Sequence, residues 1–261
     1  MNKLSTLTLI ITLIITSAVS ATNFVMLTDL GSSARSIALG NVDGYNNAAD
    51  AVFSNPAALT HVNGYSVSLF SSKLMNDVNY FNAALSAKTA HGTFAVGMYE
   101  QSVSNIASTS KSAHKSVQTG SYDFKNSVLK LSYQEDISSN LSVAATYSLY
   151  NMAVENYSAS GSNIDAGILA KFNRFSLSIF AQNILLNQTV NFSHNASEVL
   201  PFAISTTAIV PFNSFVFIPQ LKITRGHALL STGASFTPGF LPNLTLNAGY
   251  NEKLDYTAQK H

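Results

Sequence analysis

Apolar and polar side chains alternate along most of this sequence, and this alternation restricts the chain to β-structure. Residues 175–182 and 244–251 repeat the pattern, as does most of 162–172. A period of two sends successive side chains to opposite faces of a strand. The clearest example is 141–149, where Ser, Ala and Thr alternate with an apolar or aromatic set: Leu141, Val143, Ala145, Tyr147 and Leu149.

Eleven segments of similar length carry this pattern, and they predict about eleven strands. Strands of about ten residues are the length that crosses a bilayer at a tilt. The predicted strands are 64–71, 78–88, 92–100, 126–135, 141–155, 162–172, 175–182, 201–210, 215–224, 229–237 and 244–252.

The connections between these segments alternate in length, which favours a transmembrane antiparallel β-barrel. Short turns are expected at 89–91, 136–140, 173–174 and 211–214, and long loops at 101–125 and 183–200; the connection at 226–228 is short where a long loop is expected. Short turns on one side and longer loops on the other are typical of outer-membrane barrels. A secreted β-sandwich is the alternative. It would need more charge on its water-facing sheets than this chain has.

Charge is scarce and nearly balanced. Only 10% of the residues are charged, whereas about 25% is usual in soluble domains. The net charge of +1 provides no electrostatic basis for binding nucleic acid. The chain has no cysteine, so disulfides, thiolate metal sites and lipid attachment at a cysteine are excluded.

Residues 1–21 have the features of a secretory signal peptide. Lys3 precedes an apolar run at 7–15, and small residues at 17–21 suit cleavage after Ala21. A membrane anchor is the alternative, but the apolar run is short for a bilayer span. The mature chain is therefore predicted to begin near Thr22, outside the cytoplasm.

Residues 22–63 precede every predicted strand and carry helix signals. Asn55 followed by Pro56 is typical of a helix start, because a side-chain oxygen can accept a free N–H and proline lacks one. Apolar residues such as Ile37 and Phe53 argue against a disordered tail. A wide barrel leaves a lumen, so we interpret this segment as an internal helical plug.

The stretch "GSSARSIALGNVDGYNNAADAVFSNPAAL", residues 31–59, resembles the N-terminal signature of the FadL-type outer-membrane transport superfamily, and most closely its shorter, PorV-like branch. The later strands resemble that branch only in spacing and character. The resemblance implies a fourteen-stranded barrel whose N-terminal hatch contains the Asn-Pro-Ala element. The matching positions are Gly31, Ala34, Arg35, Leu39, Gly40, Asp50, Ala51, Asn55, Pro56 and Ala57.

The barrel segment 64–261 falls three strands short of that number. Single-chain bacterial barrels have an even number of strands, so we expect the chain to be truncated at its C-terminus, with two unpaired edges.

Pro219 lies inside a predicted strand, where proline cannot donate to the ladder. It predicts a bulge or kink. A lateral opening for a hydrophobic ligand is the functional interpretation, and a local bulge without a transport role is the alternative.

Catalytic and metal motifs are missing from the sequence. The six histidines have no metal-ligand spacing, and no Gly-x-Ser-x-Gly elbow occurs. We therefore predict no enzyme activity, no cofactor and no metal site. The resemblance implies transport of hydrophobic compounds across the bacterial outer membrane. The alternatives are a PorV-like secretion component that binds exported proteins and a structural or general-diffusion barrel; outer-membrane lipid is an expected partner in each case.

Overall fold

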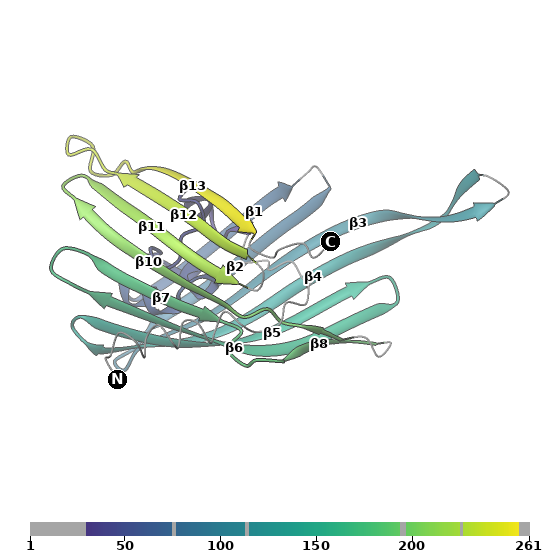
Figure 1. Ribbon diagram of the computed structural model, residues 1–261, viewed down its shortest axis with the longest axis horizontal. Coiled ribbons are helices and arrows are strands. Elements are labelled where there is room, and N and C mark those ends of the chain that lie inside the picture. Colours follow the sequence, from purple (N-terminus) through teal and green to yellow (C-terminus); the bar gives the residue numbers. More distant parts are fainter. Residues whose placement is uncertain (1–29, 75–76, 113–114, 194–196, 225–226, 256–261) are drawn as a thin grey trace.

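The computed structural model describes residues 30–74, 77–112, 115–193, 197–224 and 227–255, and its strands form one curved antiparallel sheet (Figure 1). The predicted signal peptide and residues 22–29 of the predicted plug segment lie outside the described residues. None of the described helices has the length and apolar character needed to cross a membrane.

Within the described residues, three short helices precede the first strand: α2 (Ala34–Ala38), η2 (Ala49–Phe53) and η3 (Pro56–His61). The strands are β1 (Tyr65–Leu74), β2 (Val78–Lys88), β3 (Thr93–Ser112), β4 (Lys115–Ser138), β5 (Leu141–Val154), β6 (Tyr157–Lys171), β7 (Ser176–Gln182), β8 (Thr189–Phe192), β9 (Ser197–Val199), β10 (Ala203–Phe212), β11 (Phe215–Thr224), β12 (His227–Phe236) and β13 (Leu246–Asp255).

Eleven of the thirteen described strands form one antiparallel path, in the order β1-β2-β3-β4-β5-β6-β7-β10-β11-β12-β13. β8 and β9 form a small hairpin in the connection between β7 and β10, and β8 also pairs with β6. The eleven strands of the main path correspond to the eleven predicted segments, and the all-β, antiparallel barrel fold is confirmed. Antiparallel neighbours joined by short turns make this an up-and-down meander.

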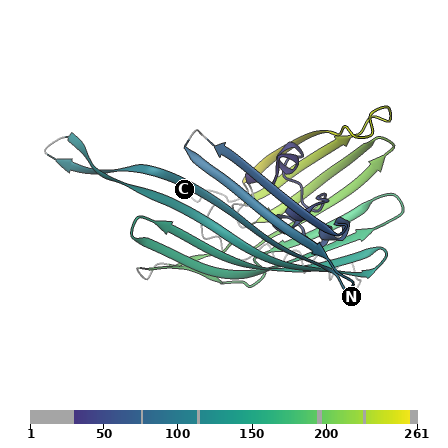
Figure 2. The ribbon, with the colours of Figure 1, turned by 180° about the vertical axis from the view of Figure 1, so that it is seen from behind.

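The two ends of the sheet differ. We call the end with the connections 89–92, 139–140, 172–175 and 213–214 the turn end; β1 begins there. We call the opposite end, where the β3–β4 pair projects beyond the other strands (Figures 1 and 2), the hairpin end. The predicted short turns are confirmed at the turn end.

The long loop predicted at 101–125 is wrong, because residues 101–112 continue β3 and residues 115–125 belong to β4. Among the described residues, β2 pairs with β3 only as far as Ser102, and β5 pairs with β4 only from Phe124 onward. Between these points the two strands pair with each other alone, with a register shift between Val103 and Ile106. Ser and Thr dominate this stretch, so it lacks the apolar alternation that identifies a strand buried on one face. The loop predicted at 183–200 likewise contains β8 and β9.

Successive side chains of each strand point alternately to the inner and the outer face of the sheet. The inner side chains are polar or contact the plug, and the outer ones are mainly apolar. In β5 the even-numbered residues from 142 to 150 are buried, whereas Ala145 and Tyr147 are exposed. An apolar outward face is typical of a wall in contact with lipid. The large apolar residues exposed on this face include Val67, Leu69, Phe81, Leu85, Phe94, Val96, Leu131, Tyr147, Ile164, Ile168, Phe217, Leu221 and Leu230.

Aromatic pairs gather at the turn end. Rows of aromatic side chains flank the apolar band of transmembrane barrels, where their rings lie at the membrane interface. The position of these pairs therefore marks one rim of the band. The ring centroids lie 4.8 Å apart in Phe94–Tyr133, 4.8 Å apart in Phe172–Phe175 and 4.3 Å apart in Phe215–Phe236.

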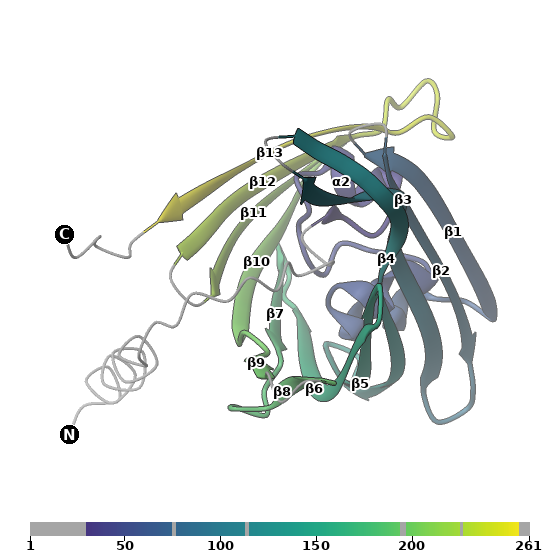
Figure 3. The ribbon, with the colours of Figure 1, turned by 90° about the vertical axis from the view of Figure 1, so that its right-hand side faces the viewer.

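β1 and β13 are the edges of the described sheet. Among the described strands, β1 pairs with β2 and β13 pairs with β12, and the path does not close between these edges. α2 lies against the inner side of β13 (Figure 3). The expected truncation, with further strands completing a barrel of fourteen, stays a prediction.

Pro219 does not form the predicted bulge. Its strand pairs with β12 without a shift, Pro219 lying opposite Thr232. On the other side, the β10–β11 ladder pairs Thr207 with Gln220 and resumes at Val210 and Phe217 in the same register. Proline has no N–H to donate, so it interrupts the ladder locally while the flanking hydrogen bonds keep the register.

The part of the β3–β4 hairpin beyond the neighbouring strands should open far more readily than the rest of the same strands. An isolated two-stranded ribbon is only marginally stable in water. We expect the amides of 106–110 and 117–122 to exchange with deuterium much faster than those of 94–101 and 126–133. Hydrogen exchange followed by mass spectrometry measures this difference, and equal protection along both strands would contradict it.

Candidate functional site: the plugged lumen

Residues 30–62, which we call the plug, fill the space that the sheet encloses (Figure 3). Val52, Ala57 and Leu59 have no exposed surface. The helical plug expected from the sequence is therefore confirmed inside the lumen. Plug residues Ala49, Ala51, Val52, Phe53, Ala58, Leu59 and Val62 share one apolar cluster with wall residues Tyr80, Ala84, Ala95, Tyr99, Val128 and Tyr150.

Asn55 joins the plug to the wall. Its Oδ1 accepts a hydrogen bond from the Ala57 backbone N–H at 2.9 Å, which caps η3 as the sequence predicts. Its Nδ2 faces three oxygens of β6 and β7: the Ile168 carbonyl at 3.0 Å, the Ser178 hydroxyl at 2.7 Å and the Ile179 carbonyl at 3.1 Å. One fully buried amide thus starts a helix and bridges two strands.

Glycines in the wall let the plug approach this closely. A Cβ on Gly167 would lie 1.9 Å from Asn55 Oδ1, and one on Gly97 would lie 2.5 Å from Val52. A Cβ on Gly249 of β13 would lie 2.2 Å from the Leu39 carbonyl carbon. Glycine weakens a strand, and its presence often marks close approach by another backbone. The sequence analysis missed these residues, although isolated glycines inside alternating segments are the signal that could have found them.

α2 is short and is closed by Gly40. Ser33 caps its start by accepting a hydrogen bond from the Ser36 N–H at 3.2 Å. Gly40 follows the helix with φ +72°, a left-handed conformation that glycine adopts without strain. A Cβ at Gly40 would also lie 2.7 Å from the carbonyl oxygen of Tyr250 in β13. Gly31 has a φ of +89°, and its carbonyl accepts a hydrogen bond from Tyr80.

Arg35 and Asp50 organise the plug internally. The Asp50 carboxylate accepts hydrogen bonds from Ser33 Oγ at 2.8 Å and Asn46 Nδ2 at 2.9 Å. Arg35 lies over the ring of Tyr45, 4.8 Å from its centroid. The predicted hatch residues therefore do not converge on one pocket: Asn55 faces β6 and β7, Gly40 faces β13, and Asp50 faces other parts of the plug.

A second attachment of the plug involves residues that the sequence analysis did not single out. The Asp43 backbone N–H donates to Gln220 Oε1 at 2.6 Å, and the Asp43 carboxylate accepts from Ser205 Oγ at 2.7 Å. Gln220 also accepts from Thr207 at 2.7 Å. These contacts hold the plug against β10 and β11, directly beside Pro219. No local sequence pattern relates Asp43 to Gln220.

The connection between β7 and β10 contributes to the same interior. Val190 and Leu200 are buried in the apolar cluster beside the plug. A Cβ on Gly161 of β6 would lie 2.8 Å from the Thr189 carbonyl oxygen, so glycine again permits close contact. β6 therefore meets this connection near residue 161 and the plug near residue 167.

A buried ion pair connects the wall strands to the β7–β10 connection. Lys130 Nζ and Asp165 Oδ2 are in contact, and each side chain is 1% exposed. Asp165 also accepts hydrogen bonds from Ser148 Oγ at 3.1 Å and from the Asn183 backbone N–H at 2.9 Å. Removing charges from water costs free energy unless each charge is paired and hydrogen-bonded. Here the pair links β4, β5 and β6 to the start of the β7–β10 connection.

The turn end of the plug is held by polar contacts. Thr60 Oγ1 donates to Asp136 Oδ1 at 2.7 Å, and Lys88 Nζ donates to the Thr60 carbonyl at 3.4 Å. Partial desolvation lowers the pKa of His61, and the charge of Lys171 lowers it further, while Asp136 acts in the opposite direction. Burial and the neighbouring lysines thus favour the neutral form of the His61 imidazole.

The described part of the chain contains no candidate metal site. No group of three or more His, Cys, Asp or Glu side chains is placed there to hold a metal ion. The buried carboxylates of Asp50 and Asp165 are each hydrogen-bonded within the protein. The lumen thus contains a packed and anchored plug.

Known proteins resemble this chain in structure but not in sequence. No protein-family model matches the sequence, and no curated protein matches it. The crystal structure of the Pseudomonas putida toluene transporter TodX aligns with a TM-score of 0.56 at 13% sequence identity, over 85% of this chain and 83% of that chain. The CymD monoaromatic hydrocarbon channel aligns with a TM-score of 0.47 at 12% identity, over 89% and 94% of the two chains. The alignment with TodX shows that the chain has the fold of FadL-type barrels. The finer resemblance to the PorV-like branch stays a prediction.

Replacing Asn55 with alanine should release the plug from β6 and β7. The change removes the cap of η3 and leaves buried wall oxygens without a donor. We expect the free energy of local plug opening to fall by about 2–4 kcal/mol. Hydrogen exchange of the Ala57 and Ala58 amides measures this energy.

Asn63→Ala is the matched control for that substitution, because Asn63 is exposed at the end of the plug. Its exchange pattern should equal that of the unmodified protein. Equal protection of Ala57 in both variants would refute the anchoring role of Asn55.

Gly167→Ala tests the same contact from the wall. The added Cβ would overlap Asn55 Oδ1, and overpacking of this kind costs about 1–3 kcal/mol. We expect faster exchange in η3 and a lower unfolding temperature in detergent. Gly120→Ala is the control, because a Cβ there meets no atom within 4 Å. Identical behaviour of the two variants would contradict the proposed close contact.

Proposed function

We propose that this chain is a non-enzymatic outer-membrane barrel that admits hydrophobic compounds and is held closed by its plug. The observation that carries the proposal is the anchored plug inside a wall with an apolar outer face. A structural barrel needs no separate polypeptide segment in its lumen, whereas a regulated passage does. The fold shared with a toluene transporter agrees with this function.

The interior favours an apolar solute over a polar one on the side formed by β2 to β5. There the plug meets the wall through aromatic contacts, and the rings of Phe53 and Tyr99 lie 5.2 Å apart. A hydrophobic solute could replace such contacts at little cost, because it restores the buried apolar surface. A polar solute would lose its water without gaining equivalent hydrogen bonds.

A lateral exit beside Pro219 is part of the proposal and requires movement of the plug. The inner side of β11 is covered there, since Ile218 packs against Leu39 and Val42. An exit through this wall would require the end of α2 to move away from it. The weaker pairing of β10 with β11 at Pro219 supports that location. No contact in the described structure favours exported proteins as cargo, and the secretion role stays a prediction.

Uptake into cells tests the function directly. The chain is expressed in a bacterium with an intact outer membrane, and entry of the hydrophobic dye N-phenylnaphthylamine is followed by fluorescence. Entry of the polar β-lactam nitrocefin is followed by its periplasmic hydrolysis. We expect faster dye entry and unchanged nitrocefin entry with the unmodified chain.

The Asn55→Ala variant extends this test. It should raise nitrocefin entry several-fold, because a loosened plug opens an aqueous path, while Asn63→Ala should not. No acceleration of dye entry by the unmodified chain would overturn the transport proposal. Equal acceleration of both solutes by the unmodified chain would instead support a general-diffusion barrel.

A further inference from the structure

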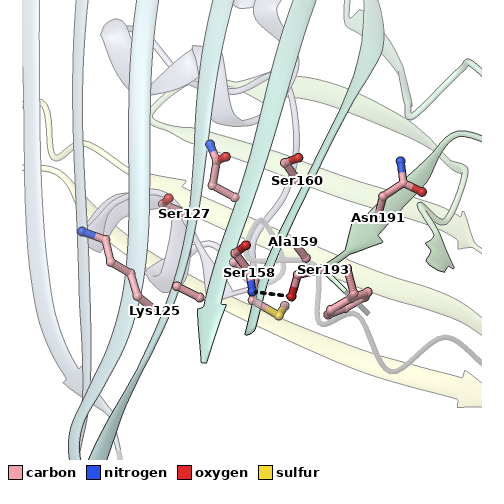
Figure 4. Close-up of a pocket in the computed structure, with 11 residues that line it drawn as sticks. Lys125, Ser127, Ser158, Ala159, Ser160, Asn191 and Ser193 are labelled. Carbon is pink, nitrogen blue, oxygen red and sulfur yellow. Dashed lines mark hydrogen bonds between the residues drawn. The ribbon is translucent and has the colours of Figure 1, made fainter. Parts of the chain in front are cut away.

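A polar hollow of about 450 Å³ lies on the outward face of β4, β5, β6 and β8, near the hairpin end (Figure 4). Its polar residues face away from the lumen, because they alternate with the buried residues of the same strands, while Met152, Ala159 and Phe192, which pack toward the apolar cluster beside the plug, also line it. On β4, for example, Ser127 lines the hollow, whereas Asn126 and Val128 are buried. The polar lining residues are Lys125, Ser127, Asn151, Ser158, Ser160, Asn191 and Ser193.

These side chains form a row across the strands. Ser127 pairs with Asn151, Asn151 pairs with Ser160, and Ser160 pairs with Asn191. Directly opposed residues of neighbouring strands have Cβ atoms about 5 Å apart. Four hydroxyl and amide groups therefore present donors and acceptors at regular spacing on one face.

The same strands become apolar toward the turn end. One step toward the turn end, the outward-facing pair on β4 and β5 is Leu129 and Leu149. One step further, Leu131 of β4 lies opposite Tyr147 of β5, which lies opposite Ile164 of β6. An apolar groove of about 670 Å³ crosses the outward face there and is lined by Leu131, Tyr147 and Ile164 among others. One continuous surface thus has a polar hollow at one level and an apolar groove at the next.

The charges around the polar hollow restrict the kinds of ligand that it can bind. Its one cationic residue, Lys125, is paired with Glu100 at 2.8 Å, so the two charges compensate each other. The other polar lining groups are neutral hydroxyls and amides. Phosphate groups are usually bound by several Arg or Lys side chains or by free backbone N–H groups. Neutral Ser and Asn side chains match the hydroxyl groups of a sugar, which both donate and accept hydrogen bonds.

We propose that this surface binds a glycolipid of the outer leaflet, with its sugars in the polar hollow and an acyl chain along the apolar groove. This inference rests on the outer-membrane location proposed above, but not on the transport function. The polar hollow lies nearer the hairpin end and the apolar groove lies within the apolar band. A glycolipid in a membrane has the same arrangement, with its sugars on the water side and its acyl chains in the hydrocarbon layer. The row Ser127–Asn151–Ser160–Asn191 supplies the hydrogen bonds that select the sugars.

Binding in detergent tests the site without reference to solute uptake. The purified chain is mixed with rough lipopolysaccharide, which carries core sugars, or with lipid A, which lacks them, and bound lipid is counted by native mass spectrometry. We expect lipopolysaccharide to bind more tightly than lipid A. The double variant Asn151→Leu/Asn191→Leu should bind lipopolysaccharide about tenfold more weakly, as expected for the loss of one or two hydrogen bonds, and lipid A as before.

Asn79→Leu is the matched control, because Asn79 is an exposed asparagine on β2 outside the hollow. It should bind lipopolysaccharide like the unmodified chain. Ser160→Leu provides a second variant if the double variant does not fold, as judged by its heat-modifiable migration in gels. Equal binding of lipopolysaccharide and lipid A, or full binding by the row variants, would overturn the proposal. Loss of solute uptake with retained lipopolysaccharide selectivity would contradict only the transport function.

Discussion

Close packing between the plug and the inner face of the sheet is the interaction on which the rest of this structure depends. A curved sheet of eleven paired strands encloses more space than its own side chains fill. The plug fills that space with an apolar cluster, and Asn55 and Asp43 satisfy buried polar groups on neighbouring strands of the wall, β6–β7 and β10–β11. Both kinds of contact are needed, because burial without hydrogen bonds would leave the buried oxygens of the wall that face Asn55 without a donor.

Glycines explain how such packing is compatible with regular strands. Gly97, Gly167 and Gly249 lie on three different strands, and each admits a different part of the plug. The strands give up some intrinsic stability at these positions, and the burial of the plug offsets it. The inner wall is therefore shaped for one particular occupant, and under the proposed function a solute has to displace the plug in order to pass.

The outer wall follows a different requirement. Its apolar band and the aromatic pairs at the turn end suit a hydrocarbon environment. Toward the hairpin end the same strands change to Ser and Asn within two residues. Inner and outer faces alternate along each strand, so one sequence satisfies lipid on one side and the plug on the other. The scarcity of charge in the strands is a consequence of both requirements.

The period-two pattern by itself determined the antiparallel all-β fold, the eleven strands of the main path and the short turns, because alternation and turn residues are local signals. Asn55-Pro56 likewise determined the start of η3, since a cap depends only on neighbouring residues. The extension of β3 and β4, the undisturbed register at Pro219 and the contacts Asn55–Ser178, Asp43–Gln220 and Lys130–Asp165 were decided by the tertiary structure. Each depends on backbones that are brought together from distant parts of the chain, where cross-strand hydrogen bonds and burial outweigh local preference.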